Sequence, residues 1–321
     1  MDITILENGT ERSVSGLVPT AELSGAYNQA CRTLSFSLVQ DETVEEIKTA
    51  LGQEIRLYEG TENLFSGRIF TRGVSADSKH IELQCRDRGI YLKKNRAAYS
   101  FSGAPAEEIA RTVANDYGIP IGNLAKTGVG VTRLFTGDDL YSIIMTAYTK
   151  AAETTGKKYV LRFAEDKMNV FEKGVAGATI LGDAESILTA RYSESLERTI
   201  TQVGIHDNKG NFLRNINNDA LLEAYGLMRE YIRQQKNTDA AKEAAKKLRD
   251  YGIERKASVE NLGDPSLVTG DTVIIREKNT GLYGKFFIDE DAHRWKNGLY
   301  TNKLTLAFEN MMDEAEAGQT K

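Results

Sequence analysis

The sequence predicts an α+β protein that is mainly β. It would contain two antiparallel β-barrel or β-sandwich domains, a small α+β module between them, and a helical insert in the second β domain. Short segments near both ends alternate apolar and polar residues, which is the period of a half-buried strand. A middle region and a later stretch instead repeat apolar residues every three or four positions, as helices do. The 321 residues are enough for two or three domains.

Residues 1–98 are predicted to form the first β domain. In RTLSFSLVQ, the apolar residues from Leu34 to Leu38 face one side of a strand, and the serines between them face the other. Asn8-Gly9 predicts a hairpin turn, because both residue types tolerate a positive φ. Strands are predicted in four more segments: ITIL, QEIRLYEG, NLFSGRIFTRG and KHIELQCRD.

Residues 99–182 are predicted to form the small α+β module. Pro105 can occupy the first turn of a helix, and apolar residues recur every four positions after it. A second helix is predicted to begin at Asp138 or Asp139. The segment KKYVLRFAEDKMNVFEKG then predicts two strands joined by a tight turn near Glu165.

Residues 183–321 are predicted to form the second β domain, with the helical insert at 218–252. Apolar residues keep helical spacing across about 219–235, which predicts one helix there. Thr238 is a suitable N-cap for a second helix that ends near Gly252. Strands are predicted again in DTVIIRE, GKFFIDED and NKLTLAFEN.

The last ten residues, MDEAEAGQTK, are small and charged, and we expect them to fray. The first residues lack the basic start and apolar run of a signal peptide, so none is expected. No strict repeat is visible in the sequence. Two β domains that flank an insert can nevertheless be structural relatives whose sequences have diverged.

The composition argues against several classes of function. The chain has 41 Lys and Arg against 46 Asp and Glu, a formal charge of −5, whereas proteins that grip nucleic acid by its phosphates usually carry a basic surplus. Sequence-specific nucleic-acid binding is therefore not expected. Cys31 and Cys85 lie in no CxxC motif, and two free cysteines indicate synthesis in a reducing compartment. No apolar run approaches about 18 residues, so no membrane insertion is expected.

Motifs that carry chemistry are missing from the sequence. It contains no GxSxG, HExxH, GxxxxGK[ST] or EF-hand pattern. We therefore expect no catalytic residues, no cofactor and no metal site.

One segment, FFIDEDAHRWKNGLYTNKLTLAFEN at 286–310, concentrates carboxylates beside a histidine and holds the only tryptophan. Asn297-Gly298 between two alternating runs predicts a type I′ hairpin turn. Counting outward from that turn, we predict which residues share one face and which stand opposite them. The shared face holds Asp289, Asp291, His293 and Trp295, and their partners are Leu306, Leu304, Asn302 and Tyr300.

The predicted Asp289, Asp291 and His293 cluster has two interpretations. A metal site would need further ligands, and a hydrolase would need a nucleophile or second carboxylate that the sequence does not place. A polar group satisfied across strands or across a subunit contact is the favoured interpretation. We therefore treat these residues, with Trp295 and the turn Asn297-Gly298, as candidates for packing or assembly.

Three stretches carry a family resemblance: LFSGRIF…ELQCRDRGIYLKKN, GDPSLVTGDTVII and GLYGKFFIDEDAHRWKNGLYTNKLTLAFEN. They resemble the baseplate hub proteins of contractile phage tails, in particular the hub of PBSX-like prophages and the late control gene D family. NNDALLEAYGLMREYI also looks like the helical insert of that family.

The resemblance implies a structural protein that is not an enzyme. Such hubs form a ring, usually a homotrimer, in which each chain contributes two tube-like β domains. The implied partners are the chain itself, the tail tube protein, the central spike protein and other baseplate proteins. The implied location is the virion tail baseplate or a tail-like bacteriocin particle, after synthesis in the bacterial cytoplasm. Two alternatives remain open: a tail-tip cell-wall hydrolase that uses Asp289, Asp291 and His293, and a carbohydrate- or receptor-binding tail module.

Overall fold

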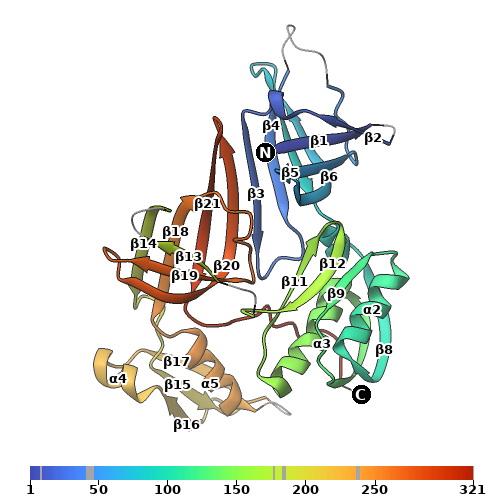
Figure 1. Cartoon of the computed structure of the whole chain (residues 1–321). Helices are drawn as coiled ribbons and strands as arrows, with labels where there is room; N and C mark the ends of the chain where they lie inside the picture. Colours follow the sequence, from blue (N-terminus) through green and yellow to red (C-terminus); the bar gives the residue numbers. More distant parts are fainter. Residues whose placement is uncertain (8, 41–46, 176–177, 183–185, 236–238, 321) are drawn as a thin grey trace. The chain divides into compact units, whose positions relative to one another are not determined.

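The computed structural model describes all residues except 8, 41–46, 176–177, 183–185, 236–238 and 321. It confirms the predicted class, because the chain is mainly β with large antiparallel sheets (Figure 1). The chain forms two compact units. The first comprises Met1–Ala190 and Ser258–Lys321, and the second comprises Arg191–Ala257.

The N-terminal strands of the first unit form an antiparallel sheet in the order β3-β4-β7-β6-β5-β1-β2. All five predicted strand segments are confirmed, whereas β3 was not predicted because it buries only Ala21 and Leu23. The turn predicted at Asn8-Gly9 lies partly outside the described residues, at Asn8. The elements are β1 (Asp2–Glu7), β2 (Thr10–Ser13), a 3-10 turn (Ser15–Leu17), β3 (Thr20–Ala26), β4 (Thr33–Val39), β5 (Glu54–Glu59), β6 (Glu62–Val74) and β7 (His80–Arg86).

An α+β region follows, and both of its predicted helices are confirmed. The first begins directly after Pro105, and the second begins after Asp139, whose carboxylate accepts the Ser142 N–H at 3.0 Å. The predicted turn is also present, with positive φ at Glu165 (48°) and Asp166 (65°). The elements are α1 (Gly89–Lys94), β8 (Arg96–Pro105), α2 (Ala106–Asp116), β9 (Ile121–Leu124), β10 (Gly130–Asp139), α3 (Leu140–Thr155), β11 (Tyr159–Ala164) and β12 (Lys167–Glu172).

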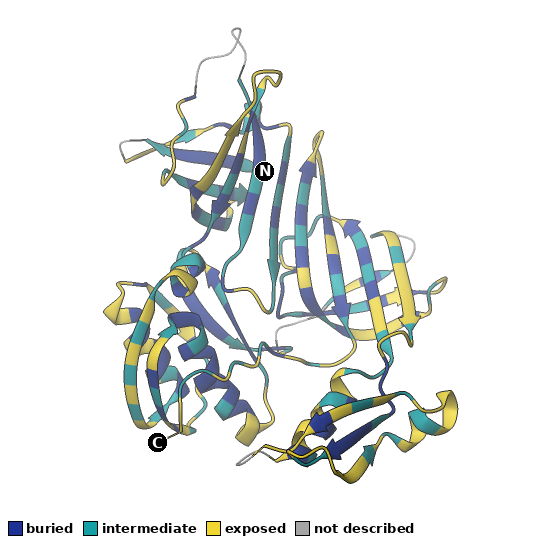
Figure 2. Ribbon diagram, turned by 180° about the vertical axis from the view of Figure 1, so that it is seen from behind, coloured by how far each residue is buried: buried dark blue, intermediate teal, exposed yellow. Residues whose placement is uncertain are grey.

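The helix α3 buries most of its length, whereas α1 and α2 each bury one side. Much of α3 is buried against α2 and the neighbouring strands, in one apolar core that includes Phe135, Tyr148 and Met168 (Figure 2). Although α3 is the most apolar of these helices, no helix in the described part of the chain is long and apolar enough to cross a membrane.

The C-terminal strands extend the N-terminal sheet. These strands pair in the order β14-β18-β21-β20. The first half of β20 also pairs with β19, and β19 in turn pairs with β13. The second half of β20 pairs with β3, from Glu290↔Ala26 to Lys296↔Thr20, so thirteen strands form one sheet (Figure 1). The strands are β13 (Ala178–Gly182), β14 (Ile187–Ser195), β18 (Glu254–Leu262), β19 (Thr272–Glu277), β20 (Leu282–Lys296) and β21 (Leu299–Ala307).

The second unit begins within β14 and ends within β18, and its structure corrects the prediction of one helix over 219–235. The helix α4 stops at Tyr225, because the next residue, Gly226, has a positive φ of 83°. A right-handed helix requires negative φ values, so it cannot continue through Gly226. The chain then forms β17, which pairs in parallel with β15 and buries Ile232. The unit contains β15 (Gln202–His206), β16 (Phe212–Asn217), α4 (Asp219–Tyr225), β17 (Arg229–Arg233) and α5 (Ala240–Asp250).

The unit is therefore a three-stranded sheet with helices, and it is larger than the predicted helical insert at 218–252. The predicted N-cap Thr238 lies outside the described residues. The helix α5 is capped by Asp239, whose carboxylate accepts two backbone N–H groups, and it ends at Asp250, followed by the C-cap residue Tyr251.

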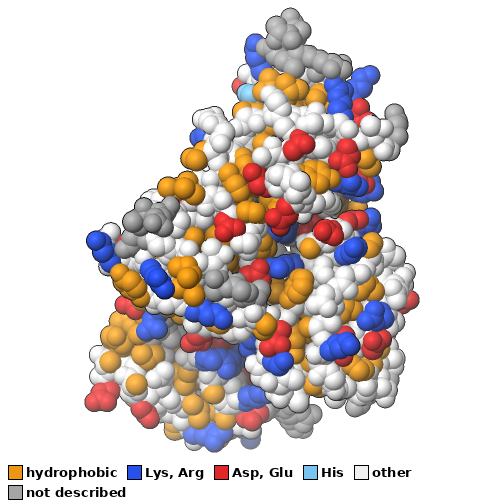
Figure 3. All heavy atoms as spheres, viewed as in Figure 1, with side chains coloured by type: hydrophobic (Ala, Val, Ile, Leu, Met, Phe, Trp, Pro, Cys, Tyr) orange, Lys and Arg blue, Asp and Glu red, His pale blue; other side chains and the backbone are white. Residues whose placement is uncertain are grey.

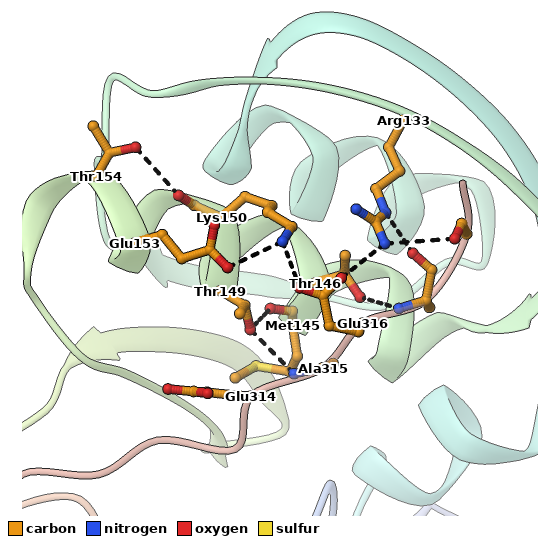
Figure 4. Close-up of polar contacts among 12 residues, drawn as sticks. Arg133, Met145, Thr146, Thr149, Lys150, Glu153, Thr154, Glu314, Ala315 and Glu316 are labelled. Atoms are coloured by element: carbon orange, nitrogen blue, oxygen red, sulfur yellow. Dashed lines mark hydrogen bonds and ion pairs between the residues drawn. The ribbon is translucent and has the colours of Figure 1, made fainter. Parts of the chain in front are cut away.

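The C-terminal segment does not fray as predicted. Residues 312–320 lie along α3 and β10 and bind them through side chains and backbone (Figure 4). Arg133 donates to the Ala317 carbonyl at 2.6 Å and to Glu316 at 2.9 Å, and Glu316 also pairs with Lys150. Small residues such as Ala315, Ala317 and Gly318 allow the C-terminal segment to lie close to α3. The small residues that led us to expect fraying therefore allow the segment to pack against the helix.

Two threonines of α3 accept backbone N–H groups of this segment. Ala317 donates to Thr146 at 2.9 Å, and Ala315 donates to Thr149 at 3.1 Å (Figure 4). Thr146 and Thr149 are both buried beneath the C-terminal segment. They hold the segment in one register along α3.

We predict that Thr146→Val loosens the C-terminal segment. The substitution keeps the shape but leaves the Ala317 N–H without its acceptor, so the free energy of unfolding should fall by about 1–2 kcal/mol in urea titrations. Thr154→Val is the matched control, because Thr154 donates within its own helix, to the Lys150 carbonyl at 3.4 Å. Its effect should stay within about 0.5 kcal/mol. Equal losses in the two variants would contradict the docking of this segment.

Candidate functional site

The predicted hairpin forms between β20 and β21. Asn297 and Gly298 have φ values of 52° and 80°, and Lys296 pairs with Leu299, as a two-residue type I′ turn requires. From the turn back to Asp291, each predicted cross-strand pair is present. The sequence count is therefore confirmed over this part of the hairpin.

The count is wrong beyond Asp291, because β20 contains a bulge. Ile288 pairs with Leu306 and Glu290 pairs with Thr305, which leaves Asp289 between them without an opposite residue. One extra residue shifts the alternation, so Ile288 and Asp289 are both buried. Asp289 thus does not face Leu306, contrary to the prediction.

Asp291 is the centre of a buried polar network. Its carboxylate pairs with Arg32 and accepts the backbone N–H and hydroxyl of Thr269, at 2.8 and 2.6 Å. Burial alone would raise the pKa of Asp291, but Arg32, His293 and Thr269 outweigh burial and lower the pKa to about 2. The group is therefore a fixed anion with its oxygens already engaged.

His293 lies beside Asp291 and is 1% exposed. Asn302 accepts the Asp264 N–H at 2.6 Å through Oδ1, so its Nδ2 is the atom that donates to His293 Nδ1 at 2.9 Å. The same Nδ1 lies 2.7 Å from the Tyr300 hydroxyl, and Nε2 lies 3.2 Å from an Asp291 oxygen. Both ring nitrogens therefore face other side chains of the buried network.

Asp289 makes different contacts from Asp291. Its carboxylate accepts from Lys173 Nζ at 2.6 Å, and the same amine donates to the Met311 carbonyl at 2.8 Å. Burial is the largest effect on both partners: it raises the pKa of Asp289 and lowers the pKa of Lys173, while the ion pair opposes both changes. The ammonium also lies 4.5 Å from the centre of the Tyr27 ring.

Trp295 packs into the apolar core of the N-terminal sheet. Its ring stacks on Tyr300 at a centroid distance of 4.6 Å, and its Nε1 donates to Glu59 at 2.9 Å. Glu59 also pairs with the N-terminal amine at 3.0 Å. The end of the hairpin is therefore anchored in the first β region.

Together these contacts form a buried polar junction. The structure brings Asp291 and His293 together, but it separates Asp289 into its own ion pair. Among the residues that the structure describes, no three His, Cys, Asp or Glu side chains are placed to hold a metal ion. Arg32, Lys173 and Thr269 complete the junction, and none of these three was predicted from the sequence. The sequence count did place Asn302 opposite His293, with which it forms a hydrogen bond.

A family model described as YQBQ-like matches residues 21–307, and the chain belongs to that family. The chain is 24% identical over 306 residues to the uncharacterized protein YqbQ of Bacillus subtilis (strain 168), covering 92% of this chain and 93% of that protein. It is 25% identical over 308 residues to the phage-like element PBSX protein XkdQ of the same strain, covering 92% and 94%.

Solved structures show the same fold. The 43 kDa tail protein of prophage MuSo2 from Shewanella oneidensis superposes with a TM-score of 0.71 at 14% identity, covering 96% of this chain and 98% of that chain. The tail protein from Neisseria meningitidis MC58 superposes with a TM-score of 0.70 at 13% identity, covering 98% of both chains. The chain therefore has the fold of phage tail proteins.

We predict that Asp291→Asn weakens the junction. The variant leaves Arg32 largely buried without its anion, so the free energy of unfolding should fall by about 3 kcal/mol at neutral pH. Because the folded pKa of Asp291, about 2, lies below its ordinary value of 3.8, the stabilisation is present above that ordinary value and is lost as pH falls through about 2. Urea unfolding between pH 2 and pH 7 measures this dependence.

Glu290→Gln is the matched control, because Glu290 is the exposed neighbour of Asp291 and accepts from Thr305 at 3.0 Å. Its effect should stay within about 0.5 kcal/mol at neutral pH. A difference between wild type and Asp291→Asn that stayed constant down to the most acid pH would contradict the assignment of a buried anion.

Proposed function

We propose that this chain is the structural baseplate hub of a contractile phage tail or a phage-tail-like bacteriocin. In this proposal it forms a ring that joins the tail tube to the central spike. The observation that carries the proposal is the β3–β20 pairing, which sets two β regions side by side in one sheet. Two sheet regions joined edge to edge within one chain are a segment from which a ring can be built.

The free sheet edges support the same proposal. In the described part of the chain, β14 and β2 each pair on one side only, and they end the path of strands. Exposed edges of this kind invite pairing with another chain unless they are covered. In a ring, neighbouring copies and the tube protein would cover them.

The surface favours protein partners over nucleic acid. Figure 3 shows acidic and basic side chains interspersed over most of the visible face, without one large basic field. The formal charge of −5 agrees with this distribution. The proposed partners are further copies of this chain in a homotrimer, the tube protein, the spike protein and other baseplate proteins, in a virion tail or tail-like particle.

The hub proposal is favoured over the tail-tip hydrolase. The side chains that a hydrolase would use are engaged: Asp289 with Lys173, and Asp291 with Arg32 and Thr269. His293 is buried and its Nδ1 accepts from Asn302. No cofactor or metal forms part of the proposal.

The proposal is tested by assembly and by activity. We expect the purified chain to form rings, seen by native mass measurement and negative-stain imaging, when it is mixed with the spike protein of its own tail gene cluster. A chain that stays monomeric with both spike and tube proteins present would contradict the hub.

A peptidoglycan-degradation assay tests the alternative. We expect no turnover by the wild-type chain, because the polar cluster is closed. Turnover that is lost in His293→Ala but kept in His206→Ala would establish the hydrolase instead. The second variant is the matched control, since His206 belongs to the other unit of the chain.

A further inference from the structure

The two β regions repeat one strand plan. The N-terminal region has the order β3-β4-β7-β6-β5-β1, and the C-terminal region has the order β14-β18-β21-β20-β19-β13. Read in chain order, β1, β3, β4, β5, β6 and β7 correspond to β13, β14, β18, β19, β20 and β21. One pairing differs in direction, because β1 is antiparallel to β5 whereas β13 is parallel to β19.

The longest strand of each repeat has the same irregularity. β6 pairs first with β5 and then with β7, and β20 pairs first with β19 and then with β21. Each changes partner at a bulge, which falls at Phe70 in β6 and at Asp289 in β20. The bulges therefore define a residue-by-residue alignment of β6 with β20, in which Phe70 corresponds to Asp289.

The same backbone hydrogen bonds hold both strands just before the bulge. In each repeat the backbone N–H of a glycine with positive φ (83° and 95°) donates to the carbonyl of an isoleucine in the long strand. The N–H of that isoleucine donates to the carbonyl of the residue after the glycine. The bonds are Gly52 N–H to Ile69 O (2.8 Å), Ile69 N–H to Gln53 O (3.0 Å), Gly270 N–H to Ile288 O (2.9 Å) and Ile288 N–H to Asp271 O (3.0 Å). The two regions therefore share individual backbone hydrogen bonds as well as strand order, although the sequence shows no strict repeat.

The repeat leaves one pairing without its counterpart. After its bulge, β20 pairs with β3 on the edge away from β21. The equivalent edge of β6, from Thr71 to Val74, pairs with no strand in the described part of the chain, and these residues are exposed. The counterpart of β3 is β14, whose outer edge is also without a strand among the described elements.

The sequences of β3 and β14 support their correspondence. Thr20-Ala21-Glu22-Leu23-Ser24 in β3 matches Thr189-Ala190-Arg191-Tyr192-Ser193 in β14 at the threonine, the alanine and the serine. The alignment places both strands in a common register. It therefore predicts which residues of β14 would stand opposite which residues of β6.

We propose that β14 of one copy pairs antiparallel with the outer edge of β6 in the next copy, repeating between chains the β3–β20 pairing within each chain. This inference rests on the proposed function, because it specifies how neighbouring hub subunits meet. The register follows from Glu290↔Ala26 and its neighbours. It predicts the pairs Thr71–Ser195, Arg72–Glu194, Gly73–Ser193 and Val74–Tyr192.

The predicted pairs are chemically complementary. Arg72 would stand opposite Glu194, and both are exposed in the single chain. Val74 and Tyr192, which are 61% and 37% exposed, would cover each other. The new strand pair would also satisfy the backbone groups of two open edges.

The pairing makes a head-to-tail interface. Each copy offers a β14 edge to one neighbour and a β6 edge to the other, so identical contacts continue until the rotation closes a ring. In a trimer, contacts of one kind would alternate within and between chains around six β regions.

The experiment is disulfide trapping in the full-length chain. Residues directly opposite in an antiparallel pair have Cα atoms about 4.5–5.5 Å apart, within the range a disulfide spans. We therefore expect Val74→Cys with Tyr192→Cys to form disulfides between copies under mild oxidation, visible on non-reducing gels. Mixing the two single variants should give covalent dimers only, because each copy then carries one of the two cysteines.

Val74→Cys with Leu188→Cys is the matched control. Leu188 lies on the same strand and is 50% exposed, but it is four residues from Tyr192, which displaces it by roughly 13 Å. The native thiols give little background, because burial raises the pKa of Cys31 to about 11 and of Cys85 to about 12. Circular dichroism confirms that each variant is folded.

The outcomes separate this pairing from the hub itself. Rings that form without trapping of the Val74–Tyr192 pair, or with equal trapping of the Val74–Leu188 pair, would overturn the strand pairing and leave the hub standing. Failure to form rings under any condition would overturn both.

A charge reversal gives an independent check. Arg72→Glu should weaken ring formation roughly five-fold at each interface, and Arg72→Glu with Glu194→Arg should restore it. Arg111→Glu serves as the matched control, because it reverses an exposed arginine on α2, outside the predicted pairing. Equal weakening by both single variants would count against the predicted register.

Discussion

The pairing of β3 with β20 is the constraint on which the rest of the structure depends. It converts two β regions, separated by an α+β region and by the second unit in the chain, into one continuous sheet. The buried pair of Asp291 and Arg32 lies at this junction and is costly to leave unpaired. Trp295, at the end of the same strand, reaches the N-terminal core, so the junction has both a polar and an apolar anchor.

Local patterns allowed much of the fold to be predicted. The alternation in β4, the helix after Pro105 and the turn at Asn297-Gly298 depend on neighbouring residues, and each is present. The register of the hairpin near its turn follows from the same local geometry. A sequence alone contains this information because the interacting groups are a few residues apart.

The remaining features depend on distant partners. Asp289 is bulged and pairs with Lys173, which lies 116 residues away, and Arg32 lies 259 residues from Asp291. No periodic pattern identifies such partners. The helix predicted over 219–235 failed for a related reason: the segment after Gly226 gains more from pairing with β15 than from continued helical spacing. The strand repeat is visible only in the order of pairing, since few residue identities survive in it.

The docked C-terminal segment has a consequence for how the chain folds during synthesis. Lys150 of α3 and Glu316 are 166 residues apart, so at roughly 5–20 residues per second about 10–30 seconds separate their appearance on the ribosome. Throughout that interval Arg133 and the α3 threonines lack the partners that the segment supplies. The α+β region is thus left incomplete until translation has passed the whole second β region, and a nascent chain interrupted earlier carries an open surface that chaperones and proteases can recognise.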